Sequence, residues 1–321
     1  MKVLVTGIDG FVGGHLARLL LAEKDVRVFG TTFLPVKNHK LLQDAGVHLR
    51  QVDLVNEEAV SDLINEIRPD ELYHLAAQSF VPSSFEDPWK TLKNNIHAQL
   101  NILQTVYMSQ LKTKVLVVGS SEEYGAVTSV DLPIAETCPL RPTSPYSVSK
   151  VAQDMLGFQY ATSKSVAAIR VRPFNHIGPG QARQFVASAF ASQIAAIEND
   201  DRPPVMVVGN LTPQRDISDV RDVIRAYVLL LRRGTVGEVY NVGSDRAVSI
   251  ELILNTLLGM TNQKIEVKTD PGLVRPVDIP LIICDSRKLR AETGWQPIYS
   301  LDQTLADILD DWRTRVRFGA A

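Results

Sequence analysis

An α/β fold built on a doubly wound parallel sheet is the architecture that this 321-residue sequence predicts. In the first half of the chain, short apolar, often β-branched runs alternate with longer amphipathic segments, as in a parallel sheet with crossover helices. The short runs are nearly all apolar, as strands covered by helices on both faces must be. The expected strands are 3–6, 26–29, 47–52, 71–75, 114–118 and 167–171, and the expected helices are 11–22, 56–66, 88–110 and 144–163.

The alternating pattern breaks at Pro173, where shorter elements punctuated by Gly178-Pro179-Gly180 and Arg202-Pro203-Pro204 begin. Gly and Pro at such positions mark turns. Residues 215–243 are typical of a helix followed by a strand that returns to the sheet. We therefore expect a larger domain of residues 1–172 plus 215–243, and a smaller mixed α/β domain of residues 173–214 and 244–321.

The charge balance excludes several classes of partner. The chain has 36 acidic and 34 basic residues, so no global field favours nucleic acid or an anionic membrane surface. An anionic ligand must therefore be held by local cations.

The two cysteines, Cys138 and Cys284, lie far apart, and the six histidines show no metal-ligand spacing. We expect neither a disulfide framework nor a metal site.

The apolar stretches are short. The longest, such as 227–231, fall far below the roughly 20 residues that a membrane-spanning helix needs. The first residues are typical of a strand and leave no room for a basic segment followed by an apolar signal core. We expect a cytoplasmic protein.

A glycine-rich loop, Thr6-Gly7-Ile8-Asp9-Gly10-Phe11-Val12-Gly13, joins the first expected strand to the first expected helix. The absence of side chains at Gly7 and Gly10 lets the backbone approach a pyrophosphate, and Gly13 lets the helix pack on the strand. The amino end of the helix supplies amide donors and partial positive charge. The loop therefore predicts a dinucleotide-binding domain of the Rossmann type in the first part of the chain, which leaves the smaller domain for the substrate.

The end of the second strand indicates which nicotinamide cofactor is used. A carboxylate at this position accepts the adenosine ribose hydroxyls and repels a 2′-phosphate. This chain has Gly30-Thr31-Thr32 there, followed by Lys37, His39 and Lys40. The pattern favours NADPH over NADH, although no arginine occupies the usual phosphate-binding position, and both cofactors stay open. Asp53, at the end of the third strand, either lies near the adenine or caps the following helix.

Tyr146 and Lys150 lie four residues apart, which places a phenol and an ammonium on one face of a helix. A tyrosine titrates near 10, so a nearby cation must favour the phenolate if the group is to exchange protons near neutrality. Such pairs are common on surface helices, but here a strand ending in Ser120-Ser121-Glu122 precedes the pair. A hydroxyl at the carboxyl edge of a parallel sheet can hold a substrate oxygen beside the tyrosine.

The chain resembles the extended short-chain dehydrogenase/reductase family over essentially its whole length. The resemblance rests on the glycine loop 6–13, on His74-Leu75-Ala76-Ala77, on Ser120-Ser121-Glu122 and on the Tyr146 and Lys150 pair. It implies a Rossmann domain, hydride transfer at the nicotinamide and a homodimer formed through a helix bundle. It also implies that Ser120 orients the sugar oxygen, Tyr146 is the general acid or base, and Lys150 tunes Tyr146.

The expected cofactor-binding residues follow the ends of the strands and the catalytic helix. They are Gly7, Gly10, Phe11, Val12, Gly13, Thr32, Asp53, Leu54, Leu75, Ala76, Ala77, Tyr146 and Lys150.

Three stretches of the second half resemble the reductases of GDP-4-keto-6-deoxymannose that form GDP-rhamnose. They are 174–181, the segment from Gly209 to Asp216, and 273–280. Arg215 and Arg275 suit a diphosphate, because a planar guanidinium binds it through two parallel hydrogen bonds. Ser121 and Asn175 complete the expected substrate site, although Asn175 alternatively caps its own loop. The expected partner is therefore a GDP-linked sugar.

Other activities share this core. GDP-mannose 4,6-dehydratases also need a glutamate at the position of Glu122, so Glu122 is included among the catalytic residues without separating the two reactions. Gly178-Pro179-Gly180 and Thr31-Thr32 depart from the arginine-rich segments of those dehydratases, which favours the reductase. A nucleotide-sugar 4-epimerase is a further alternative. The last alternative is not an enzyme but a binding protein that senses the cofactor without catalysing a reaction, because fold alone does not decide function.

Overall fold

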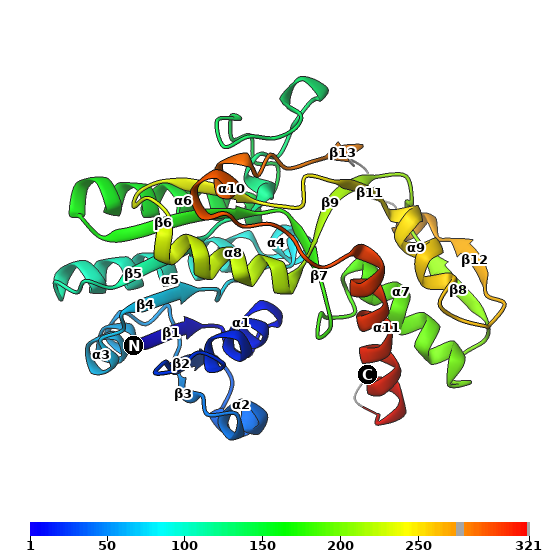
Figure 1. Ribbon diagram of the computed structural model, residues 1–321, viewed down its shortest axis with the longest axis horizontal. Helices are drawn as coiled ribbons and strands as arrows, with labels where there is room; N and C mark the ends of the chain where they lie inside the picture. The colour runs from blue at the N-terminus through cyan, green and yellow to red at the C-terminus, as the bar shows by residue number, and fades with distance from the viewer. Residues whose placement is uncertain (274–278, 320–321) are drawn as a thin grey trace.

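The computed structural model describes residues 1–273 and 279–319, and its largest element is a seven-stranded parallel sheet. The strands of this sheet are β1 Lys2–Thr6, β2 Arg27–Thr32, β3 His48–Gln51, β4 Glu71–His74, β5 Lys114–Val118, β6 Ala167–Pro173 and β10 Val239–Val242. Their order is β10-β6-β5-β4-β1-β2-β3, with every neighbouring pair parallel (Figure 1). The strand order changes direction beside β1, where doubly wound sheets bind their ligands.

Helices cover both faces of this sheet, which confirms the predicted fold class. They are α1 Phe11–Leu21, α2 Lys40–Asp44, α3 Glu57–Ile67, α5 Pro88–Met108, α6 Pro145–Lys164, α8 Val220–Arg233 and α10 Arg287–Thr293. The segments between the strands also contain α4 Val81–Glu86 and the 3-10 helices η1 Val36–His39, η2 Ser121–Glu123 and η3 Ser129–Asp131. Val3 and Val5 of β1 pack with α1 and α8, whereas Leu4 packs with α3 and α5. Successive strand residues point to opposite faces, so strands between two helix layers are apolar throughout.

The helix starts follow from local sequence. Ser144 caps α6, where its side chain accepts a hydrogen bond from the Ser147 N–H, and Asp87 caps α5 by accepting from the Lys90 N–H. Each cap precedes a proline at the first helical position, where the missing N–H costs nothing. These starts position α6, which carries Tyr146 and Lys150.

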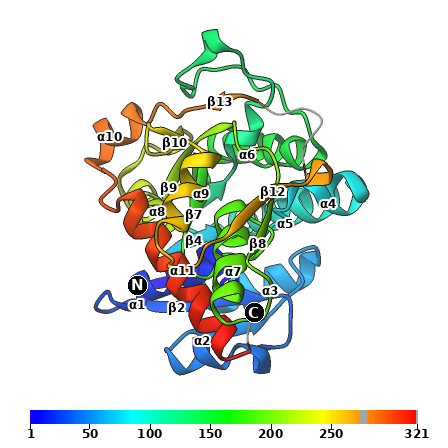
Figure 2. The same ribbon diagram turned by 90° about the vertical axis from the view of Figure 1, so that its right-hand side faces the viewer.

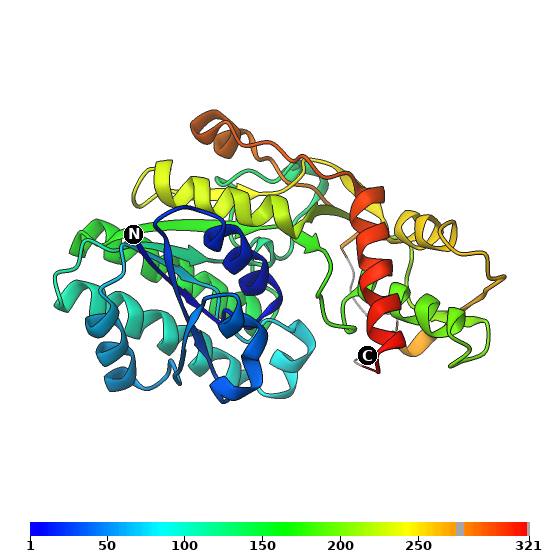
Figure 3. The same ribbon diagram turned by 60° about the horizontal axis from the view of Figure 1, so that its bottom comes forward.

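A smaller part of mixed structure lies beyond the carboxyl ends of the sheet strands (Figures 1 and 3). Its strands are β7 Asn175–Ile177, β8 Val205–Val208, β9 Gln214–Asp219, β11 Ala247–Ser249, β12 Glu266–Thr269 and β13 Leu281–Ile282, and its helices are α7 Val186–Glu198, α9 Ile250–Leu258, η4 Pro271–Leu273 and α11 Leu301–Arg317. In Figure 2, α11 and α7 lie side by side, and apolar residues of both pack into one core with α9.

The short strands of the smaller part were not predicted one by one. β13 has two residues and β7 has three, and neither length can show an alternating pattern. β8 pairs with β12, and β9 pairs with β7, β11 and β13, so each strand forms through partners distant in sequence. Among the described residues, no helix is both long and apolar enough to cross a membrane.

Trp295 anchors the chain after α10 onto α8, and we predict that Trp295→Ala lowers the free energy of unfolding by about 3–5 kcal/mol. The indole is 1% exposed, packs in the core of α1 and α8, and donates its N–H to the Asp222 carbonyl at 3.0 Å. Urea unfolding measures the change. Phe318→Ala, which removes a side chain that is 76% exposed, should change the free energy by less than about 0.5 kcal/mol. Equal effects of the two substitutions would contradict the prediction.

Candidate active site

A cavity of about 960 Å³ opens at the carboxyl ends of the sheet strands. Residues that follow β1, β2, β4, β5 and β6 line it from one side, and Gln181 and Phe185 line it from the smaller part. Its volume suits a ligand of cofactor size, and its position at the strand ends is the usual one for this architecture.

The cavity brings together most of the residues that the sequence singled out. The predicted residues that line it are Gly7, Gly10, Phe11, Val12, Gly13, Thr32, Asp53, Leu54, Leu75, Ala76, Ala77, Ser120, Ser121, Glu122, Tyr146, Lys150 and Asn175. Their contacts with ligands stay predictions.

The glycine loop fits a dinucleotide because its backbone is packed too closely for side chains. Gly7 has a φ of 64°, and a Cβ there would lie 2.9 Å from the Ala76 Cα. A Cβ at Gly13 would collide with the Gly7 carbonyl oxygen. Gly10 donates its N–H to that same carbonyl at 3.1 Å and forms the amino-terminal cap of α1. The loop therefore presents a bare backbone and a helix amino terminus to the cavity, as a pyrophosphate requires.

Thr6 and His74 join the ends of β1 and β4 beneath this loop, and sequence reasoning gave neither a separate role. The Thr6 hydroxyl accepts the Ala76 N–H at 3.2 Å and lies 2.8 Å from the His74 Nδ1. Burial lowers the pKa of His74 to about 3, so the imidazole is neutral. The threonine thereby holds the backbone of the β4 end, which lines the cavity.

The cavity wall at the end of β2 contains hydroxyls of β2 and carboxylates from two other segments. Thr32 donates its hydroxyl to the Leu34 carbonyl at 2.8 Å. Asp9, which lies in the glycine loop, also lines the cavity, and its Oδ2 is 3.5 Å from the His39 Nε2. Asp53 accepts the Val55 N–H at 3.0 Å, so it stabilises its own turn while it lines the cavity. Asn56, not Asp53, caps α3.

The Tyr146 phenol and the Lys150 ammonium are both buried on the cavity side of α6. The Lys150 Nζ donates to the Val118 carbonyl at 2.8 Å and lies 5.9 Å from the centroid of the Tyr146 ring. The Ser120 hydroxyl shares a hydrogen bond with the Tyr146 phenol. The structure therefore distinguishes Ser120 from Ser121, since it is Ser120 that contacts the tyrosine.

Burial determines the protonation states of Tyr146 and Lys150. It raises the pKa of Tyr146, the hydrogen bond from Ser120 opposes the rise, and the charges of Glu122 and Glu123 add to it. The sequence led us to expect a pKa lowered by Lys150, but removal of the phenol from water outweighs any such effect here. Burial lowers the pKa of Lys150 to about 8, and the charge of Glu123 opposes that shift. At neutral pH the site therefore holds a phenol and an ammonium.

Ser120 is held in place by the turn that follows β5. It caps η2, with its hydroxyl accepting the Glu122 N–H at 3.2 Å. Its own N–H donates to the Glu123 Oε1 at 2.8 Å. Glu123 was not singled out from the sequence, because a glutamate in a polar loop carries no signal of burial.

His176 also lines the cavity, although no motif assigned it a role. Its ring stacks on Phe11 with centroids 6.1 Å apart, and its Nδ1 lies 3.0 Å from the Phe174 carbonyl oxygen. Burial lowers the pKa of His176, so the ring is neutral near pH 7.

Lys90 and Asn94 of α5 line the cavity as well, and both come from a helix outside the recognised motifs.

The two arginines expected to bind a diphosphate are not among the described residues that line the cavity. Arg215 lies in β9, where its Nη1 donates to the Gln214 carbonyl at 2.9 Å and to the Ile279 carbonyl at 2.6 Å. Arg275 lies outside the described residues. The diphosphate role of both residues stays a prediction.

A bare glycine loop at the amino end of α1 and a hydrogen-bonded Ser120–Tyr146 pair beside Lys150 share one cavity of a doubly wound sheet. This combination defines an NAD(P)-dependent enzyme of the extended short-chain dehydrogenase/reductase class. Within this class, the chain belongs to the GDP-mannose 4,6-dehydratase family, whose model matches residues 4–308.

The relatives of the chain are named for different reactions. It is 35% identical over 316 residues to the GDP-6-deoxy-D-mannose reductase of Pseudomonas aeruginosa, with 98% of both chains covered. It is 28% identical over 350 residues to the GDP-mannose 4,6-dehydratase of Yersinia enterocolitica, with 96% of this chain and 92% of that protein covered.

Solved structures agree with the fold over nearly the whole chain. RMD from Pseudomonas aeruginosa complexed with NADPH superposes with a TM-score of 0.87 at 34% identity, covering 98% of this chain and 99% of that one. The UDP-glucose 4-epimerase of Thermus thermophilus in complex with NAD gives a TM-score of 0.85 at 28% identity, with the same coverage. The predicted family and fold are therefore confirmed.

Because Lys150 is buried, we predict a specific pH dependence of stability. Its pKa is about 8 in the folded chain against 10.5 for an ordinary lysine, so between these values the unfolded chain binds more protons. Stability contributed by this residue therefore rises with pH in that window. Between about pH 8 and about pH 10, the free energy of unfolding of the wild-type chain should increase by on the order of 1–2 kcal/mol relative to that of Lys150→Met. Urea unfolding of both proteins without cofactor measures the difference, and a constant difference would contradict the prediction.

Proposed function

We propose that this chain reduces the C4 keto group of GDP-4-keto-6-deoxy-D-mannose to give GDP-D-rhamnose, with NAD(P)H as the reductant. The observation that carries the proposal is the buried, protonated phenol of Tyr146, hydrogen-bonded to Ser120 inside the cavity. A reductase needs a proton donor beside the carbonyl oxygen, and this pair supplies one. The 35% identity to a GDP-6-deoxy-D-mannose reductase supports the choice of substrate.

The residues of the chain divide the proton chemistry between them. When bound, the nicotinamide ring supplies the hydride that reduces the keto carbon. Tyr146 donates its phenolic proton to the keto oxygen, so hydride and proton together convert the carbonyl to an alcohol. Ser120 donates a hydrogen bond to the same oxygen and stabilises the charge that develops there. The Lys150 ammonium, 5.9 Å from the tyrosine ring, stabilises the phenolate left behind.

The cofactor assignment rests on the glycine loop and the end of β2. The bare backbone at Gly7, Gly10 and Gly13 suits the pyrophosphate, and Lys150, which lines the same cavity, would hold the nicotinamide ribose. Thr32 occupies the position at which a carboxylate would repel a 2′-phosphate, so we favour NADPH over NADH. The NADPH bound to the related Pseudomonas aeruginosa structure supports this preference.

We assign the remaining cavity and its rim to the nucleotide sugar. Ser121 and Asn175 line the cavity and are proposed to bind the sugar. Arg215 and Arg275 are proposed to bind the diphosphate of GDP, which in a chain of net charge −2 requires local cations.

We also infer a homodimer in solution. Helices α5 and α6 pack against each other and leave large apolar side chains in solvent. These exposed side chains are Trp89, Met108, Val148, Met155 and Phe158. Exposed apolar residues on two packed helices suit a bundle with the same helices of a second copy.

A second candidate function, that of a GDP-mannose 4,6-dehydratase, is supported by the position of Glu122. Glu122 lines the cavity beside Ser120, where a dehydratase would need a carboxylate for the elimination of water. A GDP-mannose 4,6-dehydratase shows no net consumption of reduced cofactor, whereas a reductase consumes it in proportion to product.

We predict that the chain oxidises NADPH in step with the reduction of GDP-4-keto-6-deoxy-D-mannose, and that Tyr146→Phe lowers turnover by about 10² to 10⁴-fold. The substitution removes the proton donor but no contact of the glycine loop, so the dissociation constant of NADPH should change little. Loss of NADPH absorbance and identification of the sugar product measure the reaction.

Retention of more than about a tenth of wild-type turnover by Tyr146→Phe would exclude Tyr146 as the acid. Conversion of GDP-mannose to the keto sugar without net NADPH loss would support the dehydratase instead.

We predict that Thr32→Asp shifts cofactor preference toward NADH, because a carboxylate at the end of β2 repels the 2′-phosphate of NADPH. The measurement is the ratio of the NADPH and NADH dissociation constants, obtained by fluorescence titration, together with the ratio of kcat/KM values. Thr269→Asp is the control, since it adds the same charge at an exposed position in β12 that does not line the cavity. An unchanged ratio in Thr32→Asp would mean that the ribose phosphate is not recognised at this position.

A further inference from the structure

The catalytic group is assembled from two elements that are not continuous in the chain. Ser120 stands at the end of β5, whereas Tyr146 and Lys150 stand on α6. A displacement of about 1 Å between reacting groups can lower a rate by about 10²-fold. Something in the structure must therefore hold the Ser120 turn against α6.

Glu123 holds the Ser120 turn from below. Its side chain is completely buried, and its Oε1 accepts the Ser120 N–H at 2.8 Å. The carboxylate lies so close to Gly119 that a Cβ at that position would collide with Oε1. Glu123 therefore packs directly against the backbone that presents the Ser120 hydroxyl.

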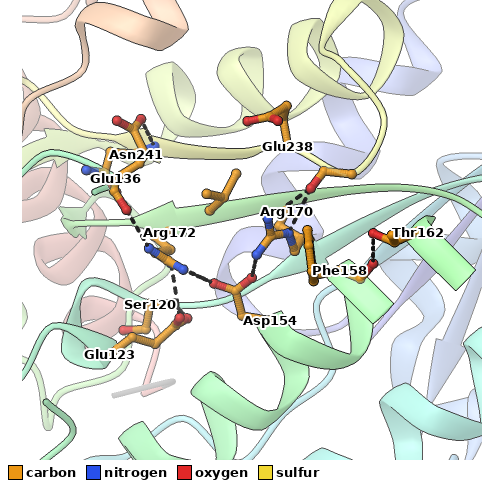
Figure 4. A network of polar contacts seen from close by, with 12 residues as sticks. Ser120, Glu123, Glu136, Asp154, Phe158, Thr162, Arg170, Arg172, Glu238 and Asn241 are labelled. Carbon is orange, nitrogen blue, oxygen red and sulfur yellow. Dashed lines mark hydrogen bonds and ion pairs between the residues drawn. The ribbon is translucent and has the colours of Figure 1, made fainter. Parts of the chain in front are cut away.

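The same carboxylate is linked to α6 through one arginine of β6. The Arg172 Nε lies 3.1 Å from the Glu123 Oε2, and the Arg172 Nη2 lies 2.5 Å from the Asp154 Oδ2 (Figure 4). Arg170 binds the other oxygen of Asp154 at 2.5 Å. Asp154 follows Lys150 by four residues and Tyr146 by eight, so all three lie along one face of α6.

All four charged groups of this cluster, Glu123, Asp154, Arg170 and Arg172, are at most 6% exposed. Two carboxyl groups face two guanidinium groups, and these contacts keep each arginine in a defined position. Burial and the nearby Asp154 raise the pKa of Glu123, and Arg172 opposes that rise. Removal of one member leaves buried partners unsatisfied, so the geometry of the others must change.

We propose that Glu123 is a positioning residue that, through Arg172 and Asp154, sets the placement of Ser120 relative to Tyr146 and Lys150. The inference rests on the proposed function of these three residues. Glu123 itself does not line the cavity and is not proposed to contact the substrate.

The test compares Glu123→Ala and Glu123→Gln with Glu71→Gln. Glu71 is also buried and ion-paired, its Oε1 lying 2.8 Å from the Arg232 Nε, but it stands at the amino end of β4, away from the cavity. Glutamine at position 123 keeps an oxygen for the Ser120 N–H and replaces the second carboxyl oxygen, which faces Arg172, with an amide nitrogen, whereas alanine removes both groups.

Glu123→Ala should lower kcat by about 10²-fold and Glu123→Gln by about tenfold, with the NADPH dissociation constant changed by less than about twofold. Glu71→Gln should leave kcat unchanged while lowering the melting temperature as much as Glu123→Gln does. In a Ser120→Ala background, Glu123→Ala should lower kcat by less than about threefold further, because both act through one hydroxyl.

Hydrogen exchange at the Ser120 amide gives a second measurement that needs no substrate. Exchange should be faster in Glu123→Ala, and should stay slow in Glu123→Gln and Glu71→Gln. A slow Ser120 amide in a folded Glu123→Ala protein, or equal losses of kcat in Glu123→Gln and Glu71→Gln, would overturn the proposal. If the wild-type chain reduces no keto sugar, the proposed function fails, and the exchange rates alone still decide whether Glu123 positions Ser120.

Discussion

The close approach of the β1 and β4 ends is the constraint on which the rest of the site depends. Gly7 adopts a φ of 64° with the Ala76 backbone where its side chain would stand, and the Thr6 hydroxyl binds both the Ala76 N–H and the His74 ring. Because the strands are parallel, their carboxyl ends share one edge, and the glycine loop, the β4 end and the serine turn after β5 open into the same cavity.

Burial is the second physical determinant of this site. It raises the pKa of Tyr146 and lowers that of Lys150, so each group is displaced toward its neutral form. A phenol that keeps its proton suits the reduction of a carbonyl, and an ammonium with a pKa of about 8 can still stabilise the phenolate formed afterwards. In the reaction we propose, Tyr146 would therefore act as the proton donor and Lys150 as the nearby cation, both of them buried.

The same core serves reductases, dehydratases and epimerases among the proteins that this chain resembles. These activities share the sheet and α6. The residues that distinguish them must therefore line other parts of the cavity. Glu122, Asn175 and His176 line the cavity from three different segments. We therefore expect the reaction of this chain to depend on how these three side chains lie relative to the substrate.

Sequence alone determined the sheet, the glycine loop and the Tyr146 and Lys150 pair, because local spacing and apolar runs encode each of them. Tertiary structure decided that Glu123 is buried, that it meets Arg172 and Asp154, and that His176 stacks on Phe11. It also placed Arg215 in β9 against the Ile279 carbonyl, a contact that no spacing in the sequence indicates. These contacts join segments separated by many residues, and a polar side chain in a loop carries no local mark of the partner that will bury it.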